Sequence, residues 1–140
     1  MATAAPSSRL STLLAPADGL LRLSLRLDAV VTGANGLAYL ALSGLLDDLL
    51  GLDRAVALGI GVFLTVYALG VAATGATRRI SPAAAGAVVV GNAAWAVLSV
   101  LAVVTGVLSL TAAGAVWAVL QALVVGGFAA LQYLGLRRAR

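Results

Sequence analysis

The stretch RLDAVVTGANGLAYLALSG, residues 26–44, is apolar enough to lie in a membrane, yet it carries polar side chains at regular intervals. In a helix, successive residues are rotated by about 100°, which places the polar ones within an arc of roughly 80°. Polar groups that face lipid without partners are costly, so this stripe is expected to point towards neighbouring helices or a second copy of the chain. Two glycines beside it, Gly33 and Gly36, would let another backbone approach closely. The stripe consists of Asp28, Thr32, Asn35, Tyr39 and Ser43.

The composition of the whole chain indicates a membrane protein. Of its 140 residues, 62% are hydrophobic and only 10% are charged. The mean hydropathy of +1.10 lies well outside the range of soluble domains. Cysteine and histidine are both absent, which excludes disulfides, thiol redox chemistry and metal sites that depend on thiolate or imidazole ligands. We therefore expect no cofactor and no metal.

Four apolar segments are each long enough to cross about 30 Å of hydrocarbon as a helix. They cover approximately residues 28–46, 55–76, 83–108 and 112–136. The predicted fold is thus an all-α membrane protein, a bundle of four transmembrane helices formed by residues 25–138. A flexible tail and an interfacial lead-in are expected at residues 1–24.

Residue types at the segment boundaries are typical of helix ends. Asp53 precedes the second segment, Ser81 with Pro82 opens the third, and Thr111 can cap the fourth. The short third connection makes the last two helices antiparallel neighbours. The motif AYLALS at 38–43 resembles AWAVLS at 94–99, which leaves open the alternative of two repeated helical hairpins.

The arginines predict the orientation, because cytoplasmic ends of membrane spans retain basic residues. The net charge is +4, and eight of the nine arginines lie before the first span, between the second and third, or after the fourth. We expect both termini on the cytoplasmic side of the plasma membrane. The arginines flank apolar spans, which favours the lipid bilayer over nucleic acid as the partner. Those expected to bind anionic head groups are Arg22, Arg26, Arg78, Arg79, Arg137 and Arg138.

Further polar residues occur on the third and fourth segments. Asn92 and Ser99 share a helix face, with Trp95 on its flank, and Asn92 is expected to meet Asn35 across the bundle. On the last segment, glutamines three turns apart can bond neighbouring helices or line a polar cavity. Tyr39, Tyr67 and Trp95 are deeper than the membrane interfaces and are read mainly as core packing. With the opening stripe, the predicted polar intramembrane cluster contains Asp28, Thr32, Asn35, Tyr39, Ser43, Asn92, Trp95, Ser99, Gln121 and Gln132.

Small residues recur every four positions along the fourth segment and form a surface for close helix packing. Packing within one bundle and association of two copies both remain open for this surface. It consists of Gly114, Ala118, Ala122, Gly126 and Ala130.

Asp28 is the one acidic residue within reach of the hydrocarbon. An intramembrane carboxylate is a functional candidate by default. Its position at the start of the first apolar segment favours a helix cap stabilised by the helix dipole. A role in proton coupling or ligand binding is the alternative. No combination of residues indicates a catalytic site.

The segments RLDAVVTGANGLAYL, GNAAWAVLSV and GAVWAVLQALVVGGFAALQYLGLRR resemble uncharacterised small four-span integral membrane proteins of actinobacterial type. This resemblance covers most of residues 25–138 and implies a fold and a membrane location, without a catalytic residue to transfer. We expect a protein without enzymatic activity, an accessory or interaction subunit that acts through helix packing, with a homodimer or a larger membrane partner as its assembly.

Two alternatives remain. One is a small dimeric transporter of a lipophilic or cationic solute, similar in size to small multidrug exporters. Those proteins carry a membrane-embedded glutamate in the first helix, and this chain has none. The other is a membrane-embedded enzyme that modifies lipids, for which the acidic residues Asp47, Asp48 and Asp53 form the one acidic cluster.

Overall fold

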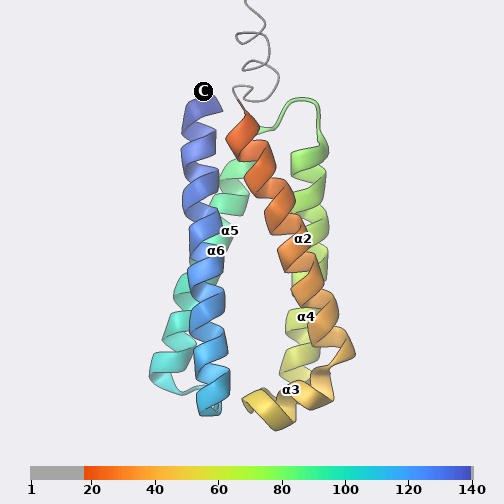
Figure 1. The fold of residues 1–140 in the computed structure, drawn as a ribbon, viewed down its shortest axis with the longest axis vertical. Helices are drawn as coiled ribbons and strands as arrows, with labels where there is room; N and C mark the ends of the chain where they lie inside the picture. The colour runs from red at the N-terminus through yellow and green to blue at the C-terminus, as the bar shows by residue number, and fades with distance from the viewer. Residues whose placement is uncertain (1–17, 140) are drawn as a thin grey trace, which may run out of the picture.

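The computed structural model describes residues 18–139, and every regular element in this range is a helix. This confirms the all-helical prediction. The four long helices lie side by side, while the short α3 lies across one end of them (Figure 1). Most of the tail expected at residues 1–24 falls outside the described residues. The elements are α2 (Gly19–Ala41), α3 (Ser43–Leu50), α4 (Arg54–Ala76), α5 (Pro82–Thr105) and α6 (Ala112–Ala139).

The long helices are arranged as two pairs, α2 with α4 and α5 with α6, and these pairs meet mainly along α2 and α6 (Figure 1). Contacts between α4 and α5 are few. Aromatic side chains bridge that side, because Phe63 of α4 stacks on Trp95 of α5 with ring centroids 5.4 Å apart. Phe63 also stacks on Tyr67, at 5.7 Å. The bundle is therefore tightest between α2 and α4 and loosest between α4 and α5.

Glycines make the tight contacts possible. A Cβ atom on Gly36 would lie 2.8 Å from the backbone nitrogen of Thr65 and 3.1 Å from the carbonyl oxygen of Gly61. A Cβ on Gly135 of α6 would lie 2.6 Å from the backbone nitrogen of Leu21. Real side chains do not tolerate such distances, so these positions set how closely α2 can approach its neighbours. Gly33, predicted with Gly36, has a looser contact with Ala68 at 3.5 Å.

The first helix differs from the expected span at 28–46. It begins nine residues earlier, at Gly19, and ends at Ala41. A bend of 90° at Leu42 then leads into α3. The early start is stabilised by Arg22, whose guanidinium donates to the carbonyl oxygens of Gly75 and Thr77 at the end of α4 and to Asp18. Arg22 thus bonds carbonyl oxygens at a helix C-terminus, and its contact with lipid head groups stays a prediction.

The bend is held by contacts with the start of α6. The backbone nitrogen of Thr111 donates to the carbonyl oxygen of Leu50, and its hydroxyl donates to that of Leu49. Gly51 ends α3 in the left-handed conformation, with φ of 69°. Gly114, on the next turn of α6, lies so close to Leu50 that a Cβ there would clash with the backbone. These contacts join the two helix pairs at the α3 end of the bundle.

The remaining boundaries are close to those expected. The second span matches α4, whereas α5 ends at Thr105, three residues early, because Gly106 adopts a left-handed conformation with φ of 67°. The caps predicted at Ser81 and Thr111 are confirmed, since their hydroxyls accept from the backbone nitrogens of Ala84 and Gly114. Asp53 occupies the N-cap position of α4 without a side-chain capping bond.

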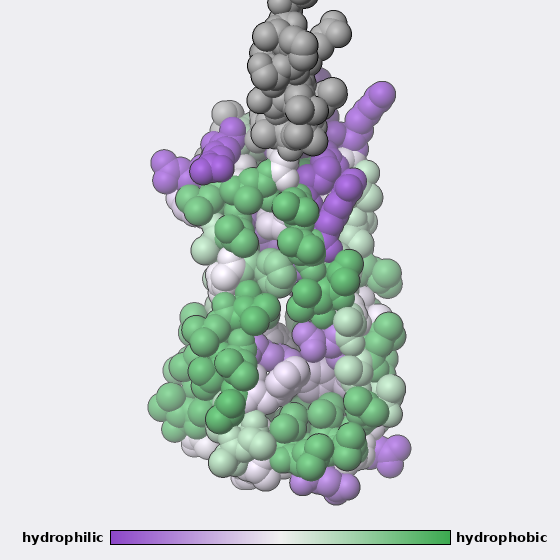
Figure 2. All heavy atoms as spheres, in the orientation of Figure 1, coloured by the Kyte–Doolittle hydropathy of each residue, from purple (hydrophilic) through white to green (hydrophobic). Residues whose placement is uncertain are grey.

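Three of the helices, α4, α5 and α6, are each long and apolar enough to cross a membrane. The bent pair α2 and α3 meets the same criterion only when taken together, so the chain has three or up to four candidate spans. Figure 2 shows a broad hydrophobic band between two hydrophilic ends. These features are those of a membrane protein.

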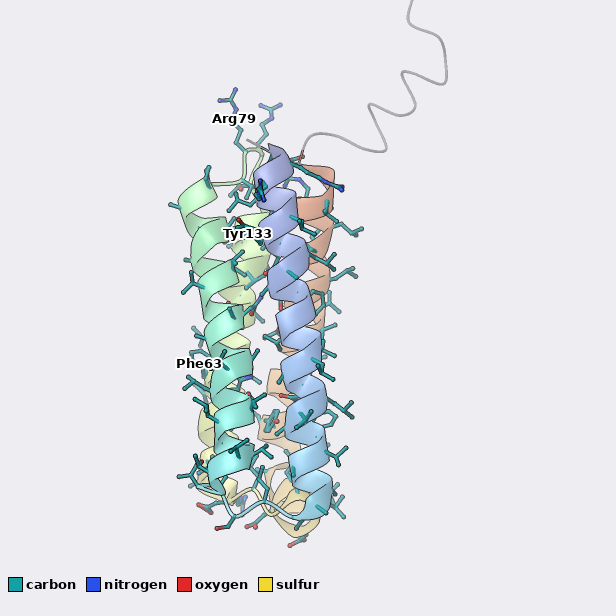
Figure 3. All side chains as sticks on the ribbon, turned by 90° about the vertical axis from the view of Figure 1, so that its left-hand side faces the viewer. Phe63, Arg79 and Tyr133 are labelled. Atoms are coloured by element: carbon teal, nitrogen blue, oxygen red, sulfur yellow. The ribbon has the colours of Figure 1, made fainter. Side chains whose placement is uncertain are left out.

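Charges of opposite kind collect at the two ends of the bundle. The start of α2, the α4–α5 connection and the end of α6 lie together at the arginine end, where Figure 3 labels Arg79. Tyr133 lies just inside this end, with the guanidinium carbon of Arg137 5.8 Å from its ring centroid. The acidic end, at α3, carries Asp47, Asp48 and Asp53, all exposed.

The predicted line of small residues on α6 faces inward only in part. Gly114 and Ala122 are buried, and a Cβ on Gly126 would lie 3.8 Å from that of Ala96, whereas Ala130 is exposed. Because four residues advance a helix by about 400°, a four-residue repeat drifts by about 40° at each step. Over sixteen residues the line therefore turns away from the bundle. Its first half packs within the chain, with Ala118 half-buried between the two buried positions.

Candidate functional site

Five polar side chains from all four long helices meet in the interior, and we refer to them as the central polar cluster. Asp28 and Thr32 come from α2, on successive turns of one face. The other three each come from a different helix. They are Tyr67 of α4, Asn92 of α5 and Gln132 of α6.

The Asp28 carboxylate is the centre of this cluster. One of its oxygens, Oδ1, accepts from the Thr32 hydroxyl at 2.7 Å. The other, Oδ2, accepts from Asn92 Nδ2 at 2.7 Å and from Gln132 Nε2 at 2.8 Å. Three donors from three helices therefore converge on one carboxylate.

The outer members bond one another as well. Asn92 Nδ2 also donates to Gln132 Oε1 at 2.8 Å. The Tyr67 hydroxyl lies 3.1 Å from Asn92 Oδ1 and 3.0 Å from the carbonyl oxygen of Val88. Each polar side chain of the cluster thus has a partner, which is what burial of polar groups in an apolar interior requires.

The centre of the cluster is fully buried, whereas Tyr67 at its edge is half-buried. Asp28 and Gln132 are both 0% exposed, and Asn92 is 3% exposed. Leu21, Leu25 and Val71 close it towards the arginine end as part of a buried apolar group. A carboxylate enclosed in this way depends on its hydrogen bonds, because an unpartnered charge in such a medium would be very costly.

Four of the five members lie at a similar depth, and Thr32 lies one turn further along α2 than Asp28. Asp28 is nine residues from the start of α2, and Tyr67 is nine residues from the end of α4. Asn92 is ten residues from the start of α5, and Gln132 is seven from the end of α6. At about 1.5 Å per residue, these positions lie roughly 10–15 Å from the arginine end. That depth is near the middle of a 30 Å hydrocarbon layer.

The interpretation of Asp28 as a helix cap is wrong. Asp28 lies inside α2, two and a half turns from its start, and its carboxylate bonds side chains of other helices. The cap interpretation assumed that the helix begins where the apolar segment begins. The N-cap position of α2 is Asp18, ten residues earlier.

The expected meeting of Asn35 and Asn92 is also wrong, for the same reason. With α2 beginning at Gly19, it is Asp28 that lies level with Asn92, and Asn92 donates to it. Asn35 lies two turns further along the same stripe and lines a groove between α2 and α6 with Gln121.

The other predicted residues lie closer to the acidic end. Tyr39, Trp95, Ser99 and Gln121 line a separate cavity there, together with Trp117. The indole Nε1 of Trp117 donates to the Tyr39 hydroxyl at 3.0 Å. Ser43 is buried at the start of α3. Of the ten residues predicted as one cluster, four belong to the central polar cluster and four line this cavity, while Asn35 and Ser43 belong to neither.

Tyr67 was assigned to core packing from the sequence, and its part in the central polar cluster was missed. The available signal was a tyrosine hydroxyl in the middle of the apolar α4, which normally needs a partner when buried. Gly91 of α5 leaves space for it, since a Cβ there would lie 2.7 Å from the Tyr67 hydroxyl. The sequence could not show which helix would supply the partner.

The chemistry available to the central polar cluster is hydrogen bonding. Among residues 18–139 there is no group of three or more acidic, histidine or cysteine side chains that could hold a metal ion. Its hydroxyls, Thr32 and Tyr67, are bonded to a carboxylate, an amide oxygen and a carbonyl oxygen. No protein-family model, curated protein or solved structure matches this chain.

Proposed function

We propose that this chain is a four-span protein of the plasma membrane without enzymatic activity, an accessory subunit that binds a helix of a larger membrane protein. The observation that carries the proposal is the outward face of α5. This helix is the least covered of the three apolar helices within the bundle. Its outward face is where the chain offers the most unpartnered helix surface.

The exposed residues of α5 follow the spacing that suits helix packing. They alternate between steps of four and three, the pattern of a left-handed helix pair. Small side chains occupy three of the positions nearest the arginine end, where a second backbone could approach closely. The row consists of Ala83, Ala87, Val90, Ala94, Val97, Leu101 and Val104, all exposed.

The closed bonding of the central polar cluster supports a role without catalysis. Acid–base or nucleophilic chemistry needs a group that can reach a substrate. Asp28 instead has three donors from its own chain and no exposed surface. The polar groups of the cluster bond neighbouring helices to one another, which suits a protein that presents a rigid surface to a partner.

Site-specific photo-crosslinking in native membranes tests the proposal. Benzoylphenylalanine at Ala94 or Val97 on the α5 row is expected to give adducts that exceed twice the 13.9 kDa mass of the chain. Matched controls are Leu69 on α4 and Leu123 on α6, which are each 67% exposed. These should give no such adduct, because the partner helix covers α5 alone.

Equal labelling at all four positions, or none at any, would contradict the proposal. An adduct at twice the mass of the chain would favour a dimer instead. That outcome points to the second candidate, the small dimeric transporter, which is favoured by the burial of Asp28 at mid-depth. Solute uptake by proteoliposomes that is driven by an ion gradient and lost in Asp28→Asn would then identify transport.

The proposed orientation places the arginine end, and therefore both termini, in the cytoplasm. A green fluorescent protein fused after Arg140 is expected to be fluorescent, and an alkaline phosphatase fused at the same place to be inactive. The same two reporters inserted after Gly51, at the acidic end, should show the reverse pattern. An active phosphatase after Arg140 would refute this orientation.

A further inference from the structure

A cavity lined by aromatic and polar side chains lies at the acidic end of the bundle, and we refer to it as the distal cavity. It has a volume of about 150 Å³ and lies between the two helix pairs, below the cluster. A dry cavity of about this size can hold a molecule as large as benzene. Leu50 of α3 and leucines of the two adjoining connections form its apolar floor. Its aromatic and polar lining residues are Tyr39, Trp95, Ser99, Trp117 and Gln121.

One buried side-chain donor of this lining makes no hydrogen bond. The Ser99 hydroxyl donates to the carbonyl oxygen of Trp95 at 2.7 Å, and the Trp117 indole donates to Tyr39. By contrast, Gln121 Nε2 is buried beside the Tyr39 hydroxyl, which already accepts from Trp117, and it makes no hydrogen bond of ordinary length within residues 18–139. A buried donor without an acceptor is destabilising, and it indicates that an acceptor belongs beside it.

The lining also defines the charge of a ligand. No aspartate or arginine lines the distal cavity. A charged ligand would therefore lose its hydration without gaining a counter-ion. A neutral molecule with an apolar body and one oxygen acceptor, such as a carbonyl, satisfies both the leucine floor and the Gln121 amide.

A groove on the outer surface adjoins the distal cavity. This groove, of about 130 Å³ between α2 and α6, shares Trp117 and Gln121 with the distal cavity. Figure 2 shows this face hollowed at mid-height, with hydrophilic side chains inside the hollow. A molecule dissolved in the bilayer could enter sideways and pass directly along Gln121.

We propose that the distal cavity binds one small uncharged amphiphile, the size of a single ring, whose carbonyl oxygen accepts from Gln121 Nε2. The apolar body of the ligand lies against Trp95 and Trp117, and any attached chain leaves through the groove towards the lipid. This site is independent of the partner surface on α5.

Tryptophan fluorescence reports binding directly, because the chain has two tryptophans and both line the distal cavity. The full-length protein in lipid nanodiscs is titrated with 4-bromoacetophenone, in which bromine quenches indole fluorescence. Bromobenzene, which lacks the carbonyl, serves as the matched probe. Saturable quenching by the ketone with one site per chain is expected.

Two kinds of variant distinguish the contribution of the Gln121 amide to binding from that of the cavity volume. Gln121→Leu should weaken binding of the ketone about fivefold, the usual effect of one hydrogen bond, and leave binding of bromobenzene unchanged. This variant should fold normally because it removes an unpartnered donor. Ala118→Phe, or Ala102→Phe from the opposite wall, should abolish saturable binding of both probes by filling the space. Leu123→Ala, outside the lining, should bind both as the wild type does.

Linear quenching that never saturates would overturn the proposal, as would equal ketone affinity in the wild type and Gln121→Leu. The ligand could be a lipid ester carbonyl or a free amphiphile. Nanodiscs of ether-linked lipids distinguish these sources, because they contain no ester carbonyl. Tighter ketone binding in ether lipids identifies the lipid as the competing ligand, whereas unchanged binding identifies a free amphiphile.

Discussion

Replacing Asp28 with leucine is expected to lower the free energy of unfolding by about 3 kcal/mol, because three buried donors lose their acceptor at once and each orphaned donor costs about 1 kcal/mol or more. The donors are those of Thr32, Asn92 and Gln132. An average interhelical hydrogen bond in a membrane protein contributes only about 0.6 kcal/mol. The larger loss of stability is expected here because all three donors bond the same carboxylate. Reversible unfolding in mixed micelles or steric trapping in bicelles measures it.

Asp28→Asn is the matched variant. It keeps the shape of the side chain and one acceptor oxygen, so it should fold and lose less stability than Asp28→Leu. The double variant Asp28→Leu with Gln132→Leu should lose less stability than the two single variants lose together. The reason is that Gln132→Leu removes a buried donor that Asp28→Leu leaves without its acceptor. An Asp28→Leu variant within about 0.5 kcal/mol of the wild type, the usual range for surface substitutions, would show that the central polar cluster does not hold the bundle together.

The helical architecture could be predicted because hydropathy and segment length determine it almost alone in a membrane. The start of α2, by contrast, could not be predicted from the sequence. Charged residues such as Arg22 mark the edge of an apolar segment, but here the carbonyl oxygens at the end of α4 satisfy the guanidinium. The helix can therefore continue back to Gly19. That partner lies more than fifty residues away in sequence, so no local pattern reveals it.

The polar stripe predicted at the first segment is confirmed for Asp28, Thr32 and Tyr39, which are buried on α2, whereas Ser43 lies beyond the bend in α3. The separation of the buried residues between different sites was not predicted. A stripe along one helix meets different neighbours at different depths. Asp28 lies level with Asn92 and Gln132, whereas Tyr39 lies level with Trp117. Those pairings depend on where each helix begins and how it bends. The nine-residue error at the start of α2 displaced them by more than two turns.

Gly36→Ala is expected to destabilise the bundle by about 2–3 kcal/mol, the range for overpacking at a site that cannot yield easily. The new Cβ would lie 2.6 Å from the Thr65 hydroxyl and 2.8 Å from the backbone nitrogen of Thr65. A side chain can rotate away, but backbone cannot, so α2 must move off α4. Thr65→Ala should therefore restore only part of the loss in the double variant.

Gly59→Ala on α4 is the matched control. Nothing lies within 4 Å of its Cβ position, so the change should leave stability unchanged or raise it by up to about 1 kcal/mol through helix propensity. Comparing the two alanines under the same unfolding conditions separates the effect of packing from that of propensity. A shift of α2 off α4 should also displace Asp28 relative to Asn92 of α5 and Gln132 of α6. The effects of Gly36→Ala and Asp28→Leu on the free energy of unfolding are therefore expected not to add in the double variant. Strictly additive losses of stability would mean that the two helix pairs are held together independently of the α2–α4 contact.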